Sequence, residues 1–397
     1  MTAVLTRPGV DAWRWPDVAA VPRVPVKAAI AAALLRRVRE RLGIGDDLLV
    51  VHRPDDFCRR LGAGGLIGFG ESYQAGDWDS ADLPALVGLL AAHVGDLVPR
   101  KLQWIRRFHS QRMPQTEISS VANAGHNIAR HYDLSNELFG SFLDETRTYS
   151  SALFDSVAPA WENLATAQRR KIDRLLDLTG VGRGTRVLEI GTGWGELALR
   201  AAQRGARVDT VTLSSEQRAL VLQRARAAGL DDRISVQLKD YRKIEGQRSY
   251  DVILSVEMIE AVGEAYWPDY FSALRRLITP TGRIGLQSIT MDHQRMLATR
   301  HTYTWIQKYV FPGGLIPSPE VIEGSGLRVL DRLDFGGDYA HTLRLWRRRF
   351  ASSFEGLRPL GFDDTFRRTW ELYLAYSEAG FASGYLNVHQ YILGAPQ

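Results

Sequence analysis

The sequence predicts an α/β protein built on a doubly wound, mostly parallel sheet. A short apolar strand at 187–190 runs into a glycine-rich turn, and a helix restarts at 196–202. Strands and helices then alternate, which is typical of a parallel sheet with helices on both faces. Before the turn lies a basic, glycine-containing region, for which we expect a smaller mixed α/β domain.

The length and composition limit the class of protein. The chain has 397 residues, 45% of them apolar, which is enough for a sizeable core and allows two or three domains. The single cysteine, Cys58, excludes an internal disulfide and a cysteine-cluster metal site, and we expect no bound metal. No segment has the build of a signal peptide or the ~20 apolar residues that span a bilayer, so we expect a cytoplasmic protein.

The N-terminal domain is expected to comprise residues 1–113. In chain order we predict a basic helix at 27–42, a strand at 48–52, β-turns within 62–76 and a helix at 83–94. The stretch 97–113 has five basic residues and no acid, interleaved with aromatic and aliphatic side chains. Such a stretch favours docking on an anionic membrane surface, and a plain solvated face remains the alternative. No nucleic-acid module is recognisable beside it, so we expect no nucleic-acid partner.

The larger domain is expected to comprise residues 114–397. Its predicted strands lie at 207–213, 234–238, 252–256 and 282–288, and its predicted helices lie at 161–178, 216–228 and 266–277. The insertion at 291–311 and the aromatic tail from 362 onward are expected to cover the carboxyl edge of the sheet. Ligands bind at that edge in doubly wound folds.

The glycine turn is the predicted ligand cradle. Its glycines allow a tight turn and a close approach of backbone N–H groups to a ligand, and they are Gly191, Gly193 and Gly195. The dinucleotide fingerprint requires a glycine where this chain has Glu196. The spacing found, with Glu189 two residues before the first glycine, resembles the first motif of the class I S-adenosylmethionine (SAM) methyltransferases. A purely structural turn and a NAD site remain alternatives. The NAD reading would use Asp209, but Asp209 lies in mid-strand.

Further motifs follow in order along the chain. They are His-Tyr-Asp-Leu-Ser at 131–135, Thr-Tyr-Ser-Ser-Ala at 148–152, Glu-Ile-Gly-Thr-Gly-Trp-Gly at 189–195, Thr-Leu-Ser-Ser-Glu-Gln at 212–217, Glu-Met-Ile-Glu-Ala-Val-Gly at 257–263, Lys-Tyr-Val-Phe-Pro-Gly-Gly-Leu at 308–315 and Asp-Tyr-Ala-His-Thr-Leu at 338–343. Together they resemble the cyclopropane-fatty-acid synthase family of SAM-dependent methyltransferases. Residues 68–78 also resemble the N-terminal domain of its longer, phospholipid-acting members.

The resemblance implies which residues hold SAM. The glycine turn would face the methionine part, with Glu189 near its ammonium, and the ribose and adenine would lie at the following strand ends. The expected cofactor-binding residues are Tyr149, Ser150, Glu189, Gly191, Gly193, Gly195, Thr212, Gln217, Asp240 and Tyr241.

The resemblance also implies a bound bicarbonate as the base. Its cage, and hence the expected catalytic set, would consist of Glu260, Gln287, Tyr339 and backbone near Ser151 and Ile289. Aromatic rings would favour a carbocation, and the candidates are Tyr149, Trp305, Tyr309 and Phe311.

Three positions depart from the family pattern. Histidine, histidine and cysteine are expected where this chain has Ala261, Gln287 and Ser151. Glutamine makes hydrogen bonds but cannot carry a proton at neutral pH as histidine can. We therefore expect the cage to be kept with altered proton traffic.

The resemblance implies C-methylation of the cis double bond of an unsaturated, oleoyl-like phospholipid acyl chain through a carbocation. The altered cage favours a methylene-branched product, the precursor of a 10-methyl fatty acid, over a plain cyclopropane. A non-catalytic lipid-binding scaffold and a small-molecule O- or N-methyltransferase are further alternatives. A flavin-dependent reductase partner, a homo- or hetero-oligomer and a peripheral location on the inner membrane surface are also implied.

Overall fold

The computed structural model describes residues 5–97, 135–155 and 158–396. The chain divides into two compact units. The first unit contains residues 1–112, 302–310 and 350–383, and the second contains 113–301, 311–349 and 384–397. The expected domain boundary at residue 113 lies outside the described residues and stays a prediction. The insertion and the tail are shared between the units, because parts of both belong to the first one.

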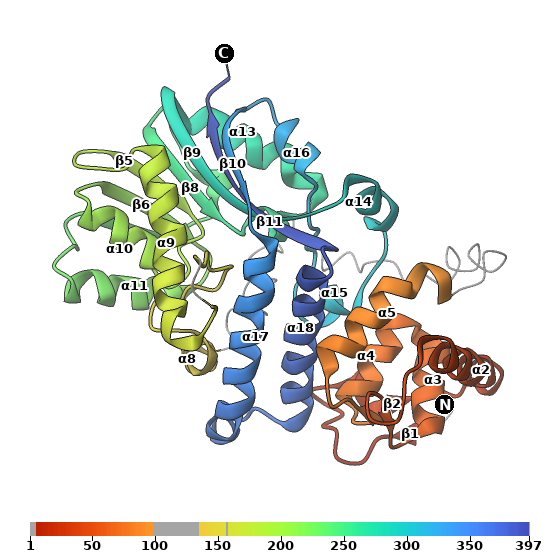
Figure 1. The fold of residues 1–397 in the computed structure, drawn as a ribbon. Coiled ribbons are helices and arrows are strands. Elements are labelled where there is room, and N and C mark those ends of the chain that lie inside the picture. The colour runs from red at the N-terminus through yellow and green to blue at the C-terminus, as the bar shows by residue number, and fades with distance from the viewer. Residues whose placement is uncertain (1–4, 98–134, 156–157, 397) are drawn as a thin grey trace. The chain divides into compact units, whose positions relative to one another are not determined.

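A seven-stranded sheet forms the centre of the second unit (Figure 1). Its strand order is β10-β11-β9-β8-β5-β6-β7. The strands are β5 (Arg186–Ile190), β6 (Arg207–Thr212), β7 (Ile234–Leu238), β8 (Tyr250–Val256), β9 (Ile278–Met291), β10 (Arg328–Asp334) and β11 (Leu386–Gly394). Strands β5 to β9 pair in parallel, with Leu188 of β5 opposite Ile253 of β8, whereas β11 runs antiparallel to β9 and β10. The predicted doubly wound, mostly parallel sheet is confirmed.

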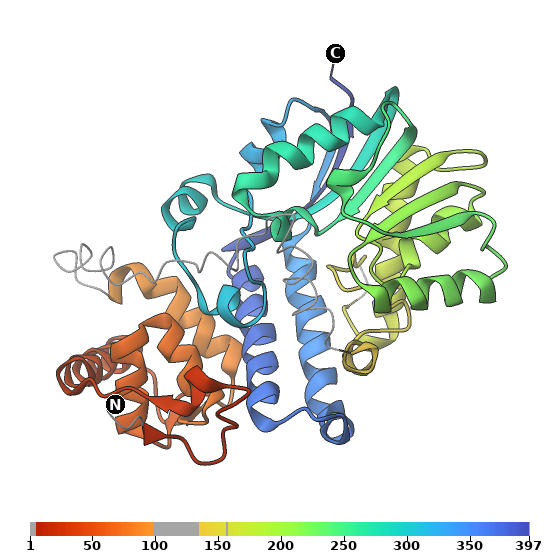
Figure 2. The same cartoon turned by 180° about the vertical axis from the view of Figure 1, so that it is seen from behind.

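Helices cover both faces of this sheet because the side chains of its strands alternate between two apolar clusters. Val187 belongs to the cluster under α9 (Trp161–Thr179), α10 (Glu196–Gln203) and α11 (Ser215–Ala227). Leu188 belongs to the cluster under α13 (Trp267–Leu277). Figure 1 shows α9 in front of the sheet, and Figure 2 shows α13 in front of it from the other side.

Six further elements and α17 complete the described part of the second unit. They are α8 (Asn136–Phe142), α12 (Ile259–Val262), α14 (His293–Thr299), α16 (Pro319–Glu323), α17 (Gly336–Ser353) and the 3-10 turns η3 (Tyr241–Lys243) and η4 (Glu264–Tyr266). From Phe350 onward α17 belongs to the first unit. No helix in the described part of the chain is long and apolar enough to cross a membrane.

The first unit is mainly helical. Its elements are β1 (Leu5–Thr6), α1 (Pro16–Ala19), β2 (Ala20–Val21), α2 (Pro25–Leu42), β3 (Val50–Val51), α3 (Pro54–Gly64), α4 (Leu66–Gln74), β4 (Trp78–Asp79), α5 (Leu83–Leu97), α15 (Trp305–Tyr309), the 3-10 helix η5 (Phe354–Leu360) and α18 (Asp364–Ala382). The predicted strand at 48–52 is reduced to two residues, Val50 and Val51. Residues 98–113 of the predicted membrane-docking stretch lie outside the described residues, and so do residues 131–134 of the motif at 131–135.

The β-turns predicted at 62–76 are wrong, because α3 and α4 occupy that stretch. The glycines of α4 let it pack closely against neighbours. A Cβ on Gly68 would lie 1.9 Å from the carbonyl oxygen of Arg60, and one on Gly70 would lie 2.3 Å from the ring of Trp305. These glycines therefore serve helix packing, which a turn-based interpretation of glycine does not anticipate.

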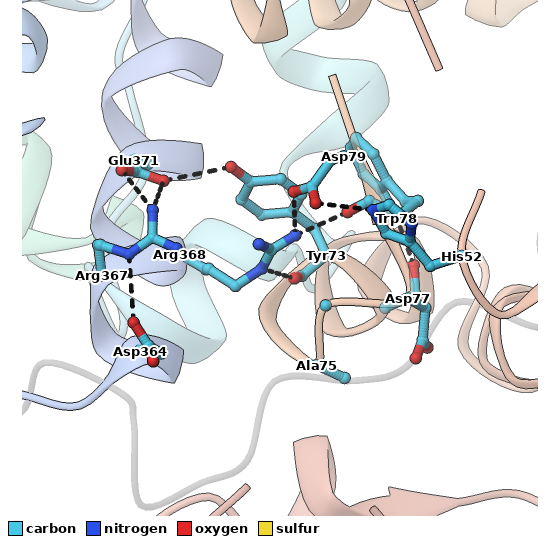
Figure 3. Close-up of polar contacts among 12 residues, drawn as sticks. His52, Tyr73, Ala75, Asp77, Trp78, Asp79, Asp364, Arg367, Arg368 and Glu371 are labelled. Carbon is cyan, nitrogen blue, oxygen red and sulfur yellow. Dashed lines mark hydrogen bonds and ion pairs between the residues drawn. The ribbon is translucent and has the colours of Figure 1, made fainter. Parts of the chain in front are cut away.

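Helix α18 packs against α4 and α5 within the first unit, and Arg368 provides its main polar contacts (Figure 3). The Arg368 guanidinium donates to the carbonyl oxygens of Tyr73 (2.5 Å) and Trp78 (2.7 Å), and to Asp79 Oδ1 at 2.5 Å. It also lies 4.3 Å from the centroid of the Tyr73 ring. A segment some 290 residues away in sequence thereby completes the N-terminal unit.

Two of the expected aromatic-wall residues make their polar contacts in the first unit. Trp305 Nε1 donates to Gln74 Oε1 at 2.9 Å, and Tyr309 Oη donates to Glu71 Oε1 at 2.8 Å. The side chains of Trp305 and Gln74 are buried. These bonds join α15 to α4.

Candidate active site

The glycine turn joins β5 to α10 in a backbone form that suits glycine. The φ angles are 95° at Gly191, 51° at Gly193 and 91° at Gly195, all in the left-handed region. A Cβ on Gly191 would lie 2.5 Å from the sulfur of Met258, whereas one on Gly193 would have no other atom within 4 Å. The backbone at Gly193 therefore faces open space.

A cavity lies at this turn, at the carboxyl end of the parallel strands. It is lined by all ten residues expected to bind the cofactor: Tyr149, Ser150, Glu189, Gly191, Gly193, Gly195, Thr212, Gln217, Asp240 and Tyr241. Their roles toward a ligand stay predictions, but the fold brings them to one place. Asp209, the acid of the NAD alternative, is not part of the lining and accepts a hydrogen bond from Tyr250 Oη at 3.1 Å.

Glu189 is the buried acid of the cavity. Thr210 Oγ1 donates to its Oε2 at 2.6 Å. Burial raises the pKa of Glu189 to about 8, and the Thr210 hydrogen bond opposes this rise only in part. The carboxyl group is thus mainly protonated at neutral pH until a cation arrives, which suits a site for an ammonium group.

The residues at the ends of β6 and β7 are fixed by local bonds. Thr212 Oγ1 donates to Gln217 Oε1 at 2.8 Å, and Ser214 Oγ caps the first turn of α11. Burial opposes ionisation of Asp240, but hydrogen bonds from Arg242 lower the pKa of Asp240 overall. The cavity therefore presents a fixed hydroxyl, an amide and a carboxylate, and these are the groups that we expect to bind the ribose and adenine of SAM.

Aromatic rings pack beside the cavity at Tyr149. The Tyr149 ring stacks on Trp346 with centroids 5.4 Å apart, and Phe139 and Phe142 meet it edge-on. Trp346 is fully buried and was not identified from the sequence. Its spacing of seven residues from Tyr339 on one helix placed both on one face, and this was the available signal.

The expected catalytic residues fall into two connected groups. In the first, Glu260 Oε1 accepts from Ser288 Oγ at 2.9 Å and from the backbone N–H of Ile289 at 2.5 Å. Burial raises the pKa of Glu260 to about 8, and the neighbouring Glu257 adds to the rise. Its Oε2 has no hydrogen-bond partner among the described residues.

The second group converges on Glu257, which sequence reasoning missed. Three donors reach its carboxyl group: the backbone N–H of Ser151 (3.0 Å), Gln287 Nε2 (2.8 Å) and Tyr339 Oη (2.6 Å). The signal was present, because Glu257 directly follows β8, and ligand-facing residues occupy the carboxyl ends of parallel strands.

The implied bicarbonate does not fit this arrangement. Its expected donors at Ser151, Gln287 and Tyr339 already bind the Glu257 carboxyl group, and the N–H of Ile289 binds Glu260. Among the described residues of the group, the buried polar atom left over is Glu260 Oε2, while Glu260 Oε1 already accepts two hydrogen bonds. The cage is therefore filled by an acid of the chain itself.

Lys171 and Gln390 make further hydrogen bonds to this group, and the sequence analysis identified neither of them. Lys171 is fully buried on α9 and donates to Ser150 Oγ and, at 2.8 Å, to the carbonyl oxygen of Ser151. Burial lowers the pKa of Lys171 to about 7, against the effect of Glu257. A lysine one turn before Leu175 on the apolar face of a helix was the available signal.

Gln390 of β11 fixes the Gln287 amide. Its Nε2 donates to Gln287 Oε1 at 3.0 Å, so the Nε2 of Gln287 must face Glu257. Gln390 Oε1 in turn accepts from Arg174 Nη1 at 3.0 Å. Gln287, at a position where the resemblance implied histidine, is thus part of a hydrogen-bonded chain that runs through the sheet.

Comparisons with known proteins agree with this fold. Residues 119–391 match the family described as mycolic acid cyclopropane synthetase. The tuberculostearic acid methyltransferase UfaA1 of Mycobacterium tuberculosis is 54% identical over 97% of this chain and 96% of its own length. The cyclopropane-fatty-acyl-phospholipid synthase of Escherichia coli K12 is 31% identical over 86% of each chain.

One similar solved structure contains a product of the cofactor. The mycolic acid cyclopropane synthase CmaA1, complexed with S-adenosylhomocysteine (SAH) and CTAB, superposes with a TM-score of 0.61 and 27% identity. The match covers 71% of this chain and 99% of that one. Fold and cavity together define a class I SAM-dependent methyltransferase.

The chain belongs to the mycolic acid cyclopropane synthetase family. It is a SAM-dependent lipid methyltransferase, as the resemblance in the sequence predicted.

Proposed function

We propose that this enzyme methylates the cis double bond of an oleoyl-like phospholipid acyl chain and leaves a methylene branch. The observation that carries the proposal is the fixed amide of Gln287, held between Gln390 and Glu257 where the family pattern has histidine. An amide cannot take up a proton, so deprotonation must proceed differently from the histidine-containing pattern. The relative named for tuberculostearic acid supports a fatty-acid substrate.

The reaction that we propose has three steps. The double bond attacks the sulfonium methyl group, SAH leaves, and a carbocation forms on the other carbon. A hydride then shifts from the methyl-bearing carbon to that cation. Loss of a proton from the new methyl group finally gives the exocyclic double bond. The aromatic group around Tyr149 excludes water and favours the cation through its ring faces.

The alternative is a plain cyclopropane synthase, in which the first cation closes onto the new methyl carbon as that carbon loses a proton. The likeness to the Escherichia coli synthase and the retained Glu260 and Tyr339 favour it. Incubating the purified enzyme with SAM and oleoyl phospholipid, followed by NMR of the acyl esters, separates the two. Vinylidene signals support the proposal, and high-field ring protons without them overturn it.

The remaining expectations also belong to this proposal. They are a flavin-dependent reductase that saturates the methylene branch, an oligomeric assembly and docking on the inner membrane surface. The expected basic stretch 97–113 is the docking candidate on sequence grounds. Sedimentation with anionic vesicles should weaken as salt is added. Sedimentation that does not change with salt would reassign the stretch to a solvated face.

A further inference from the structure

The carboxyl group of Glu257 fills the expected cage beside the cofactor cavity. Glu257 lines the cavity, and it accepts the three hydrogen bonds from Ser151, Gln287 and Tyr339. An ionised carboxylate offers about four acceptor positions, so three donors leave one open for a further proton. A carboxyl group that can act as a base therefore lies beside the cofactor cavity.

The backbone at Glu257 is unusual for a residue with a side chain. Its φ is 52°, in the left-handed region that favours glycine, and only Arg147 and Arg248 share this sign among the described non-glycine residues. Strained backbone that persists in a buried site points to a functional constraint. Because glycine adopts this φ freely, Glu257→Gly removes the carboxyl group without opposing the local fold.

The groups around Glu257 act on its pKa in opposite directions. Burial raises the pKa of Glu257, and Lys171 opposes the rise from the helix beneath. Two other titratable side chains lie near the Glu257 carboxyl group among the described residues. Tyr339 donates a hydrogen bond to it, and Glu260 has a raised pKa that keeps it mainly protonated at neutral pH. A carboxylate whose pKa is raised is a stronger base than a free carboxylate, which suits general-base chemistry.

We propose that the Glu257 carboxylate is the base of the reaction and stands in for the bicarbonate of the family pattern. It takes a proton from the new methyl group of the carbocation, and the electron pair of that C–H bond forms the carbon–carbon double bond. The proton then leaves to solvent, so no other reactant is needed. This inference rests on the proposed function and names the base within it.

The test compares the parent enzyme with two variants in buffer depleted of carbon dioxide and in buffer with added bicarbonate. Methyl transfer to oleoyl phospholipid vesicles is followed with labelled SAM. The parent rate should differ by less than about twofold between the buffers. Glu257→Gly should lose about 100-fold or more, and added bicarbonate should restore activity by about tenfold or more, because the three donors are freed.

Glu257→Gln should lose as much as the glycine variant and gain nothing from bicarbonate, because its amide still fills the cage. Glu245→Gln, at an exposed position outside the cavity, is the matched control and should keep the parent rate. Calorimetric titration with SAH verifies that each variant still folds and binds.

Three results would overturn the proposal: a parent enzyme that requires bicarbonate, a Glu257→Gln variant that keeps its activity, or a glycine variant that bicarbonate does not restore. The parent measurement alone decides the matter should a variant fail to fold. A failure of the proposed function is a different result, because it shows as a wrong lipid product or none from the parent enzyme.

Discussion

A valine at Gly193 should abolish cofactor binding while costing only modest stability. The matched control is Gly180, which ends α9, because both glycines have positive φ (51° and 76°) and neither would have another atom within 4 Å of an added Cβ. Only Gly193 lines the cavity. The pair therefore separates backbone strain from contact with the ligand.

The expected magnitudes follow from this geometry. Left-handed backbone costs a residue other than glycine about 1–2 kcal/mol, so both variants should lose roughly 2–8 °C in Tm. At Gly193 the valine methyl groups occupy space that the ligand needs. We expect SAH affinity to fall by about 100-fold or more, which is about 2.8 kcal/mol, and to stay within about threefold for Gly180→Val.

Isothermal titration with SAH and thermal unfolding measure the two effects. Equal affinity losses in both variants would mean that strain, and not ligand contact, sets the result. Parent-like affinity in Gly193→Val would refute the placement of the cofactor over the turn.

Three further predictions concern single side chains. SAH binding at pH 7 should release protons and strengthen as pH rises through about 8, because the ligand's ammonium lowers the burial-raised pKa of Glu189. Titrations in buffers of different ionisation enthalpy measure the release, and Glu189→Gln should abolish it; identical parent enthalpies in all buffers would contradict the assignment. Gln390→Met should lower kcat by roughly 10- to 100-fold with little change in SAH affinity, because it frees the Gln287 amide to rotate. The control variant Gln237→Met on β7 should keep the parent kcat. Equal kcat values for the two variants would show that Gln390 does not position Gln287. Arg368→Met should lower the free energy of unfolding in urea by about 3 kcal/mol, whereas the neighbouring Arg367→Met should lower it by less than about 1 kcal/mol. The reason is that Arg368 is more buried and donates to two backbone carbonyl oxygens. Equal losses of stability would show that these contacts carry little energy.

The fold class could be predicted because its signals are local. Apolar strands such as 252–256 and the glycine turn carry their pattern in a few consecutive residues, and the sheet follows from their alternation. The prediction for the glycine-rich stretch 62–76 was wrong because some of its glycines pack against residues that are distant in the sequence. The partner of Gly70 is Trp305, which lies on another segment of the chain.

The candidate site was predictable only in part for the same reason. The residues expected to bind the cofactor lie in contiguous motifs, so a motif that is found in the sequence also predicts the role of its residues. Glu257 acquires its role only from partners on separate elements, including Gln287 on β9 and Tyr339 on α17. Lys171 and Gln390 belong to none of the motifs, and the hydrogen bonds that make them important form only in the folded chain.

The segment 350–394 has a consequence for how the chain folds. It supplies α18, which packs against α4 and α5, and then β11, which lies between β9 and β10 in the sheet. Neither unit can therefore finish its core before this segment has been synthesised, although most of the first unit emerges from the ribosome early. Closure across such sequence distances is slow, and partly built cores expose apolar surface meanwhile. The two units therefore complete their cores together, once residues 350–394 have joined both.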